Sequence, residues 1–62
     1  MSSNDMKLIE GHANRLLGMD LPPEAKNIIR NIRYLAQSGN GHYEDLEEQL
    51  AVIEQLGYQD NG

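Results

Sequence analysis

Two breaks in the chain limit its possible folds more than any other feature of the sequence. Residues 18–23 and 38–41 contain Gly, Pro, Ser and Asn, the residue types that end helices and form turns. They divide the 62 residues into three short segments, in each of which apolar side chains recur at helical spacing. No segment alternates apolar and polar residues for long enough to form a strand. The pattern predicts an all-α protein with three helices over about residues 5–17, 23–37 and 42–56.

The residues at the ends of the first segment and at the start of the second support these boundaries. Ser3 or Asn4 is suited to cap the free N–H groups of the first helix, and Gly18 is suited to end it. Pro23 fits the first position of the second helix, where a backbone N–H is not needed.

Glycines also mark the later helix ends. Gly39 or Gly41 supplies the left-handed residue that ends the second helix, and Asn40 is suited to cap the third. Gly57 followed by Tyr58 predicts a Schellman motif at the end of the third helix, with the tyrosine folding back on the last turn.

The second and third helices are similar in length and joined by a short loop, so we expect them to form an antiparallel helical hairpin. The first helix then packs across the groove between them. The chain forms a single small domain over residues 1–62, with frayed ends at about 1–3 and 59–62. The residues expected to be most buried line the facing seams of the hairpin: Ile28, Ile32, Leu35, Leu46, Leu50 and Ile53.

So short a chain has a marginal core, because a domain of this size buries only about 60% of the surface exposed by the unfolded chain. Cys is absent, which excludes disulfides and thiolate metal sites and leaves packing or self-association as the source of stability. Leu8, Val52 and Leu56 fall outside the main apolar stripes of their helices. This surplus apolar surface predicts a symmetric homodimer or, alternatively, a docking site for a different protein.

The charge of the chain is −5 and is concentrated near the C-terminus. This distribution argues against ordinary nucleic-acid binding, which requires cationic side chains to displace counterions from phosphates. It fits either a basic protein partner or a solvated acidic face. Residues 39–62 hold no Lys or Arg but six acidic residues: Glu44, Asp45, Glu47, Glu48, Glu54 and Asp60.

No motif indicates catalysis or metal binding. His12 and His42 lie in different segments without further ligands at a metal spacing, so we expect two surface histidines. The carboxylates of residues 44–48 are Glu44, Asp45, Glu47 and Glu48, and they fall mostly on the solvated side of an amphipathic helix, where a carboxylate is poorly placed for acid–base chemistry. No Ser lies near a His–carboxylate arrangement, and the small core leaves little room for a ligand pocket. The sequence predicts no catalytic residue, no cofactor, no metal and no enzyme activity.

A short basic stripe on the second helix has two interpretations. Lys26, Arg30 and Arg33 lie beside Tyr34, and cations next to an aromatic ring can contact phosphates or an acidic partner. Alternatively, they balance the acidic third helix within the chain or across a dimer. On the first interpretation Arg30 and Tyr34 join Leu8, Val52 and Leu56 as predicted protein-binding residues.

Residues 19–24 (MDLPPE), followed by a helix, a Ser-Gly loop and a second helix, resemble the ribbon-helix-helix DNA-binding proteins, which include some antitoxins. The resemblance covers about residues 16–57 and implies a DNA-contacting strand over residues 16–21. That strand in the family carries basic or amide side chains. Residues 16–21 (LLGMDL) hold none, and the helix after the loop is acidic.

These observations favour a small acidic interaction protein, a regulator, adaptor or inhibitor that docks a helical face on a larger protein. The alternative is a nucleic-acid-linked regulator, either a ribbon-helix-helix-like DNA binder or an acidic mimic of nucleic acid. The polar N-terminus and the lack of an apolar run of roughly 20 residues predict neither secretion nor membrane insertion. A cytoplasmic location is therefore expected, and the size and composition are typical of small bacterial or phage proteins.

Overall fold

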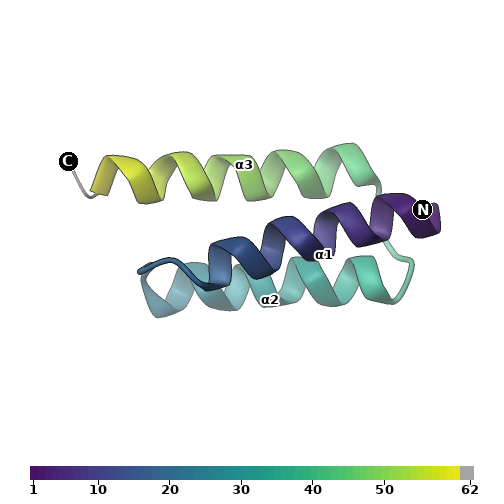
Figure 1. Ribbon diagram of the computed structural model, residues 1–62, viewed down its shortest axis with the longest axis horizontal. Helices are drawn as coiled ribbons and strands as arrows, with labels where there is room; N and C mark the ends of the chain where they lie inside the picture. Colours follow the sequence, from purple (N-terminus) through teal and green to yellow (C-terminus); the bar gives the residue numbers. More distant parts are fainter. Residues whose placement is uncertain (61–62) are drawn as a thin grey trace.

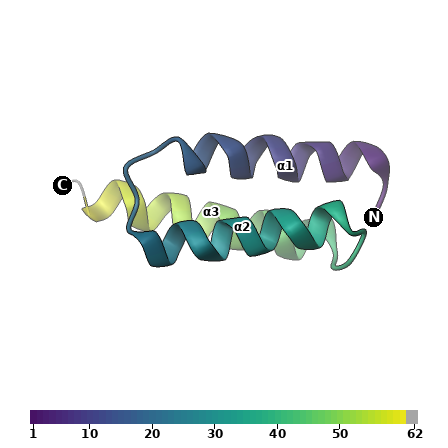
Figure 2. The same ribbon diagram turned by 90° about the horizontal axis from the view of Figure 1, so that it is seen from below.

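Three α-helices make up the fold: α1 (Ser3–Leu17), α2 (Pro23–Gln37) and α3 (Tyr43–Asp60). The computed structural model describes the backbone of residues 1–60 and the side chains of residues 1–57. The helices lie side by side, with the loop 18–22 at one end of the molecule and the loop 38–42 at the other (Figures 1 and 2). The prediction of a three-helix, all-α fold is confirmed. None of the described helices is long and apolar enough to cross a membrane.

Helix α1 begins earlier than predicted because its cap is Ser2. This residue is extended, and its Oγ accepts a hydrogen bond from the Asp5 N–H at 3.1 Å. The helix therefore starts at Ser3, and the predicted caps at Ser3 and Asn4 are wrong. Gly18 ends α1 as predicted, with its N–H donating to the Arg15 carbonyl at 3.2 Å.

The predicted ends of α2 are confirmed. The helix starts at Pro23 and closes with a Schellman motif around Gly39, whose φ is +78°. The Gly39 N–H donates to the Ala36 carbonyl at 3.1 Å, and the Asn40 N–H donates to the Leu35 carbonyl at 2.9 Å. The Asn40 Nδ2 group donates to Ser38 Oγ at 3.2 Å, and α3 begins only at Tyr43, so the predicted cap of α3 at Asn40 is wrong.

Helix α3 starts one residue later than predicted and does not end at Gly57. It continues to Asp60, so the predicted stop at Gly57 is wrong. This glycine is buried, and a Cβ atom added to it would lie 2.6 Å from Leu21 Cδ2. Its missing side chain therefore serves close packing against the 18–22 loop rather than a turn. The predicted contact of Tyr58 lies outside the described side chains.

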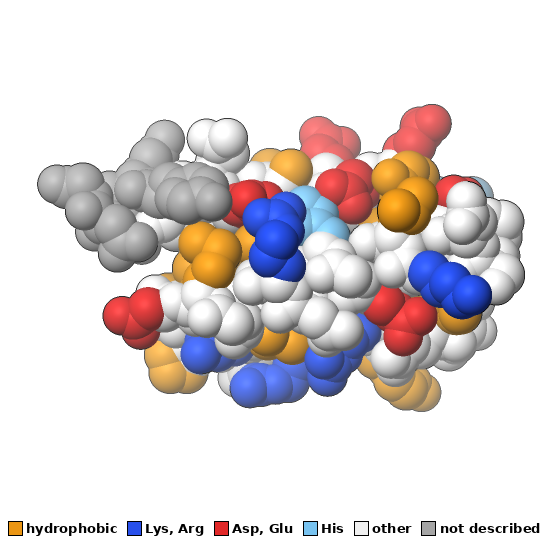
Figure 3. Space-filling view, in the orientation of Figure 1, with side chains coloured by type: hydrophobic (Ala, Val, Ile, Leu, Met, Phe, Trp, Pro, Cys, Tyr) orange, Lys and Arg blue, Asp and Glu red, His pale blue; other side chains and the backbone are white. Residues whose placement is uncertain are grey.

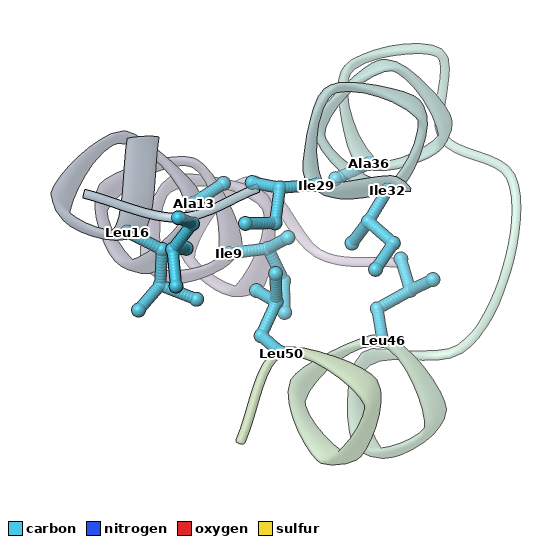
Figure 4. Close-up of a cluster of buried hydrophobic side chains, with 9 residues drawn as sticks. Ile9, Ala13, Leu16, Ile29, Ile32, Ala36, Leu46 and Leu50 are labelled. Carbon is cyan, nitrogen blue, oxygen red and sulfur yellow. The ribbon is translucent and has the colours of Figure 1, made fainter. Parts of the chain in front are cut away.

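The core draws on all three helices and on the loop between α1 and α2 (Figure 4). Of the six predicted core residues, three are buried and Leu35 and Ile53 are half-buried, but the prediction for Ile28 is wrong. Its neighbour Ile29 is buried instead, because α1 packs against the face of α2 that carries Ile29 and Ala36. The buried residues are Ile9, Ala13, Leu16, Leu21, Ile29, Ile32, Ala36, Leu46 and Leu50.

The strand implied by the ribbon-helix-helix resemblance is not formed. Leu16 and Leu17 belong to the last turn of α1, and residues 18–22 form the loop to α2. Residues 1–60 contain no strand of any kind.

Candidate interaction surface

An apolar groove runs between α2 and α3 on the side of the molecule away from α1. Ile28 of α2 and Val52 and Leu56 of α3 are 51%, 52% and 54% exposed, although all three are large and apolar. Two adjoining hollows of about 260 and 320 Å³ share Ile28 and Ile53 in their walls. We call this surface the α2/α3 groove; it is lined by Leu21, Pro22, Glu24, Ala25, Ile28, Glu48, Gln49, Val52, Ile53, Leu56 and Gly57.

Hydrogen bonds to α1 show which side of α2 the groove occupies. Arg33 Nη1 donates to Asn14 Oδ1 at 2.7 Å, and Gln37 Nε2 donates to Glu10 Oε2 at 2.9 Å, so this face of α2 is turned toward α1. At about 100° per residue, Ile28 lies roughly 140° round the helix from Arg33. The groove therefore lies on the far side of the α2–α3 pair from α1.

The groove results from apolar stripes that are wider than the core they supply. In α2, the adjacent residues Ile28 and Ile29 cannot both face inward, and packing against α1 selects Ile29. In α3, Val52 and Leu56 stand one turn apart beside the half-buried Ile53. The remaining apolar side chains are left on one side of the α2–α3 pair, where they form a continuous exposed surface.

The charged side chains that line the groove are acidic. Glu24 of α2 and Glu48 of α3 are exposed, and no Lys or Arg is among its described lining residues. The cations of α2 lie elsewhere: Arg33 contacts α1, and Arg30 donates to Asn27 of its own helix at 3.0 Å. Lys26, Arg30 and Arg33 form no ion pair with the described part of α3. These three cations therefore do not neutralise the acidic side chains of α3 within that part of the chain.

The five predicted protein-binding residues fall on three different surfaces. Val52 and Leu56 lie in the groove, where Ile28, which the sequence assigned to the core, joins them. Leu8 is 52% exposed but lies between α1 and α3, beside Lys7, His12 and Tyr43. The remaining two, Arg30 and Tyr34, are on the exposed face of α2.

A polar cluster that sequence reasoning missed connects α1 to α3. His12 Nδ1 lies 2.7 Å from Glu47 Oε1, and His12 Nε2 lies 2.8 Å from Glu54 Oε1. Only 11% of the His12 side chain is exposed, so the prediction of a surface histidine is wrong for His12, whereas His42 is exposed. An imidazolium donates from both nitrogens and satisfies both contacts, whereas a neutral ring carries one N–H.

Arg15 completes this cluster from the next turn of α1. Its guanidinium holds the Glu54 carboxylate with two hydrogen bonds, of 2.9 Å and 3.3 Å. The hydrogen bonds from Arg15 and His12 lower the pKa of Glu54 to about 2. In Figure 3, pale blue, blue and red side chains lie together in the middle of this face, with acidic groups above them over α3 and cations below them along α2.

The chain matches no protein-family model, no curated protein and no solved structure.

Proposed function

We propose that this protein is a small interaction module that binds a larger protein by receiving one of that protein's helices in the α2/α3 groove. The observation that carries the proposal is the exposure of Ile28, Val52 and Leu56 side by side on one surface. Contiguous exposed apolar surface usually marks an interaction site. In this proposal α2 and α3 form an antiparallel hairpin, with α1 on one face and the partner's helix on the other.

The form of the groove favours a helical partner over a small ligand. Gln49, Val52, Ile53 and Leu56 follow an i, i+3, i+4, i+7 series on α3, the ridge against which a neighbouring helix packs. The hollows lie along the seam of two helices and are bordered by half-exposed side chains. A helix laid along this seam would complete a four-helix arrangement.

The acidic face of α3 supports the nucleic-acid-mimic alternative less well. Glu47 and Glu54 are turned toward α1 and held by His12 and Arg15. Two of the acidic side chains of α3 are therefore engaged within the fold and not available to form a row of phosphate-like charges.

Affinity capture from a lysate of the source organism tests the proposal with two matched variants. Ile28→Ser/Val52→Ser removes the apolar groove, whereas Leu8→Ser/Tyr34→Ser removes side chains of similar exposure on other faces. The protein retained by the parent should be lost with the groove variant and kept with the control, with circular dichroism confirming that both are folded. Retention by the groove variant and loss by the control would contradict the proposal.

A further inference from the structure

We infer that the occupant of the α2/α3 groove is a basic amphipathic helix of a different protein, with an apolar stripe flanked by Lys or Arg. The inference rests on the proposed function and specifies the chemistry of the partner. Its basis is the combination of an apolar floor with acidic edges: Glu24 stands on the α2 side and Glu48 on the α3 side. Apolar anchors with flanking cations match both features at once.

The acidic edges are not neutralised by the protein itself. No Lys or Arg is found among the described residues that line the groove. Arg33 donates to Asn14, and Arg15 holds Glu54 on the opposite side of α3. The net charge of −5 adds a general attraction for cationic partners, which acts during encounter.

A second copy of the chain fits the groove less well than a basic helix. A two-fold contact pairs a surface with itself, so every charged side chain brought to the interface by the groove would be acidic. Like charges facing one another at an interface oppose association. A helix that carries Lys or Arg at its flanks can contact the same apolar floor without this repulsion.

A peptide-display selection against the folded protein tests this inference. The library consists of 18-residue helical peptides with a fixed leucine stripe and flanking positions that are Lys, Glu or Gln. The parent protein should enrich Lys over Glu at the flanks by roughly tenfold, the effect expected from two exposed charge pairs. The reversed variant Glu24→Lys/Glu48→Lys should enrich Glu instead.

A charge-matched control separates the groove from the net charge of the protein. Glu10→Lys/Glu44→Lys changes the net charge by the same amount, but neither residue lines the groove. This variant should keep the preference for Lys. The most enriched peptide should also bind the folded Ile28→Ser/Val52→Ser variant at least tenfold more weakly than the parent, as measured by fluorescence anisotropy.

Several results would overturn the inference. The parent could enrich no peptide, or could enrich Glu or Gln at the flanks. The preference for Lys could change to one for Glu in both double Lys variants, or the peptide could bind the Ile28→Ser/Val52→Ser variant as tightly as the parent. A parent dimer at micromolar concentration, pH 7 and low salt that Ile28→Ser dissociates would assign the groove to a second copy. If the lysate partner still depends on the groove while Lys is not enriched, the basic helix is excluded and the proposed function stands.

Discussion

Gly11 in α1 and Gly57 in α3 both lie inside helices but have opposite surroundings. A Cβ atom on Gly11 would meet nothing within 4 Å, whereas one on Gly57 would lie 2.6 Å from the buried side chain of Leu21. Gly11→Ala should therefore raise the free energy of unfolding by about 1 kcal/mol, the helix-propensity difference. At Gly57 the displacement of Leu21 costs about 1–3 kcal/mol and offsets that gain.

Urea denaturation of both variants provides the comparison. Gly11→Ala should unfold at a higher urea concentration than the parent, and Gly57→Ala at the same or a lower concentration. Equal stabilisation by the two substitutions would show that the contact between Gly57 and Leu21 does not restrict this position.

Glu54 makes the free energy of unfolding depend on pH in the acidic range. Its folded pKa is about 2 and its ordinary value is 4.5, so the unfolded state binds the proton first as pH falls. The stability supplied by its bonds to Arg15 and His12 is complete above about pH 4.5 and declines as the pH approaches 2. The stability difference between the parent and Glu54→Gln should therefore narrow over this range in pH-dependent urea unfolding.

The removal of Arg15 supplies the control for this prediction, because its hydrogen bond is the largest cause of the lowered pKa. Glu54→Gln is therefore also made in an Arg15→Gln background. There, the change in unfolding free energy caused by Glu54→Gln should vary less between about pH 5 and about pH 2 than in the parent background. A difference that stays constant with pH in the parent would mean that these bonds do not stabilise the folded carboxylate.

The His12 cluster shows which residue contacts the sequence could not specify. The partners of His12 lie 35 and 42 residues away along the chain, so they meet only once α1 and α3 are packed. A weak signal was present in the spacing. His12 and Arg15 are three residues apart on one helix, and Glu47 and Glu54 are seven apart on another, so each pair shares a helix face.

At the scale of the helices, local signals specified α2 better than its neighbours. Pro23 and Gly39 act within one turn of the helix ends, and both boundaries were predicted correctly. In α3, by contrast, Gly57 does not mark the helix end but packs against Leu21, which reaches it from a loop distant in sequence. The choice between Ile28 and Ile29 likewise depends on where α1 packs, and this is not encoded in the periodicity of α2 alone.

Substitutions in α2 test the orientation of that helix. Ile32 is 1% exposed and should cost about 2–5 kcal/mol of unfolding free energy when replaced by Ala, because the change leaves a cavity in the core. Ile28→Ala makes the same chemical change at a half-exposed position and should cost under about 1 kcal/mol. Chemical denaturation of both proteins gives the comparison, and equal costs would show that Ile28 belongs to the core.

At the scale of the whole molecule, the three helices divide the surface into regions of different chemistry. α1 forms polar side-chain contacts with α3 through His12 and Arg15, and it accepts hydrogen bonds from α2 through Asn14 and Glu10. The opposite side of the α2–α3 pair keeps its apolar residues exposed beneath acidic edges. The surplus apolar surface was evident from the sequence, but its division between the groove and the separate site of Leu8 required the packed structure.

Self-association should depend on the acidic edges of this groove. At pH 7 and low salt, repulsion between the acidic groups of two copies opposes pairing, and sedimentation equilibrium at micromolar concentration should give the monomer mass of 7.0 kDa.

Near the isoelectric point of about 4.7, or at high salt, this repulsion weakens and the apolar floors can pair. Ile28→Ser/Val52→Ser should suppress that association, whereas Leu8→Ser should not. A stable dimer at pH 7 and low salt would show that apolar contact outweighs the repulsion, and association lost with Leu8→Ser would move the dimer interface to the α1–α3 face.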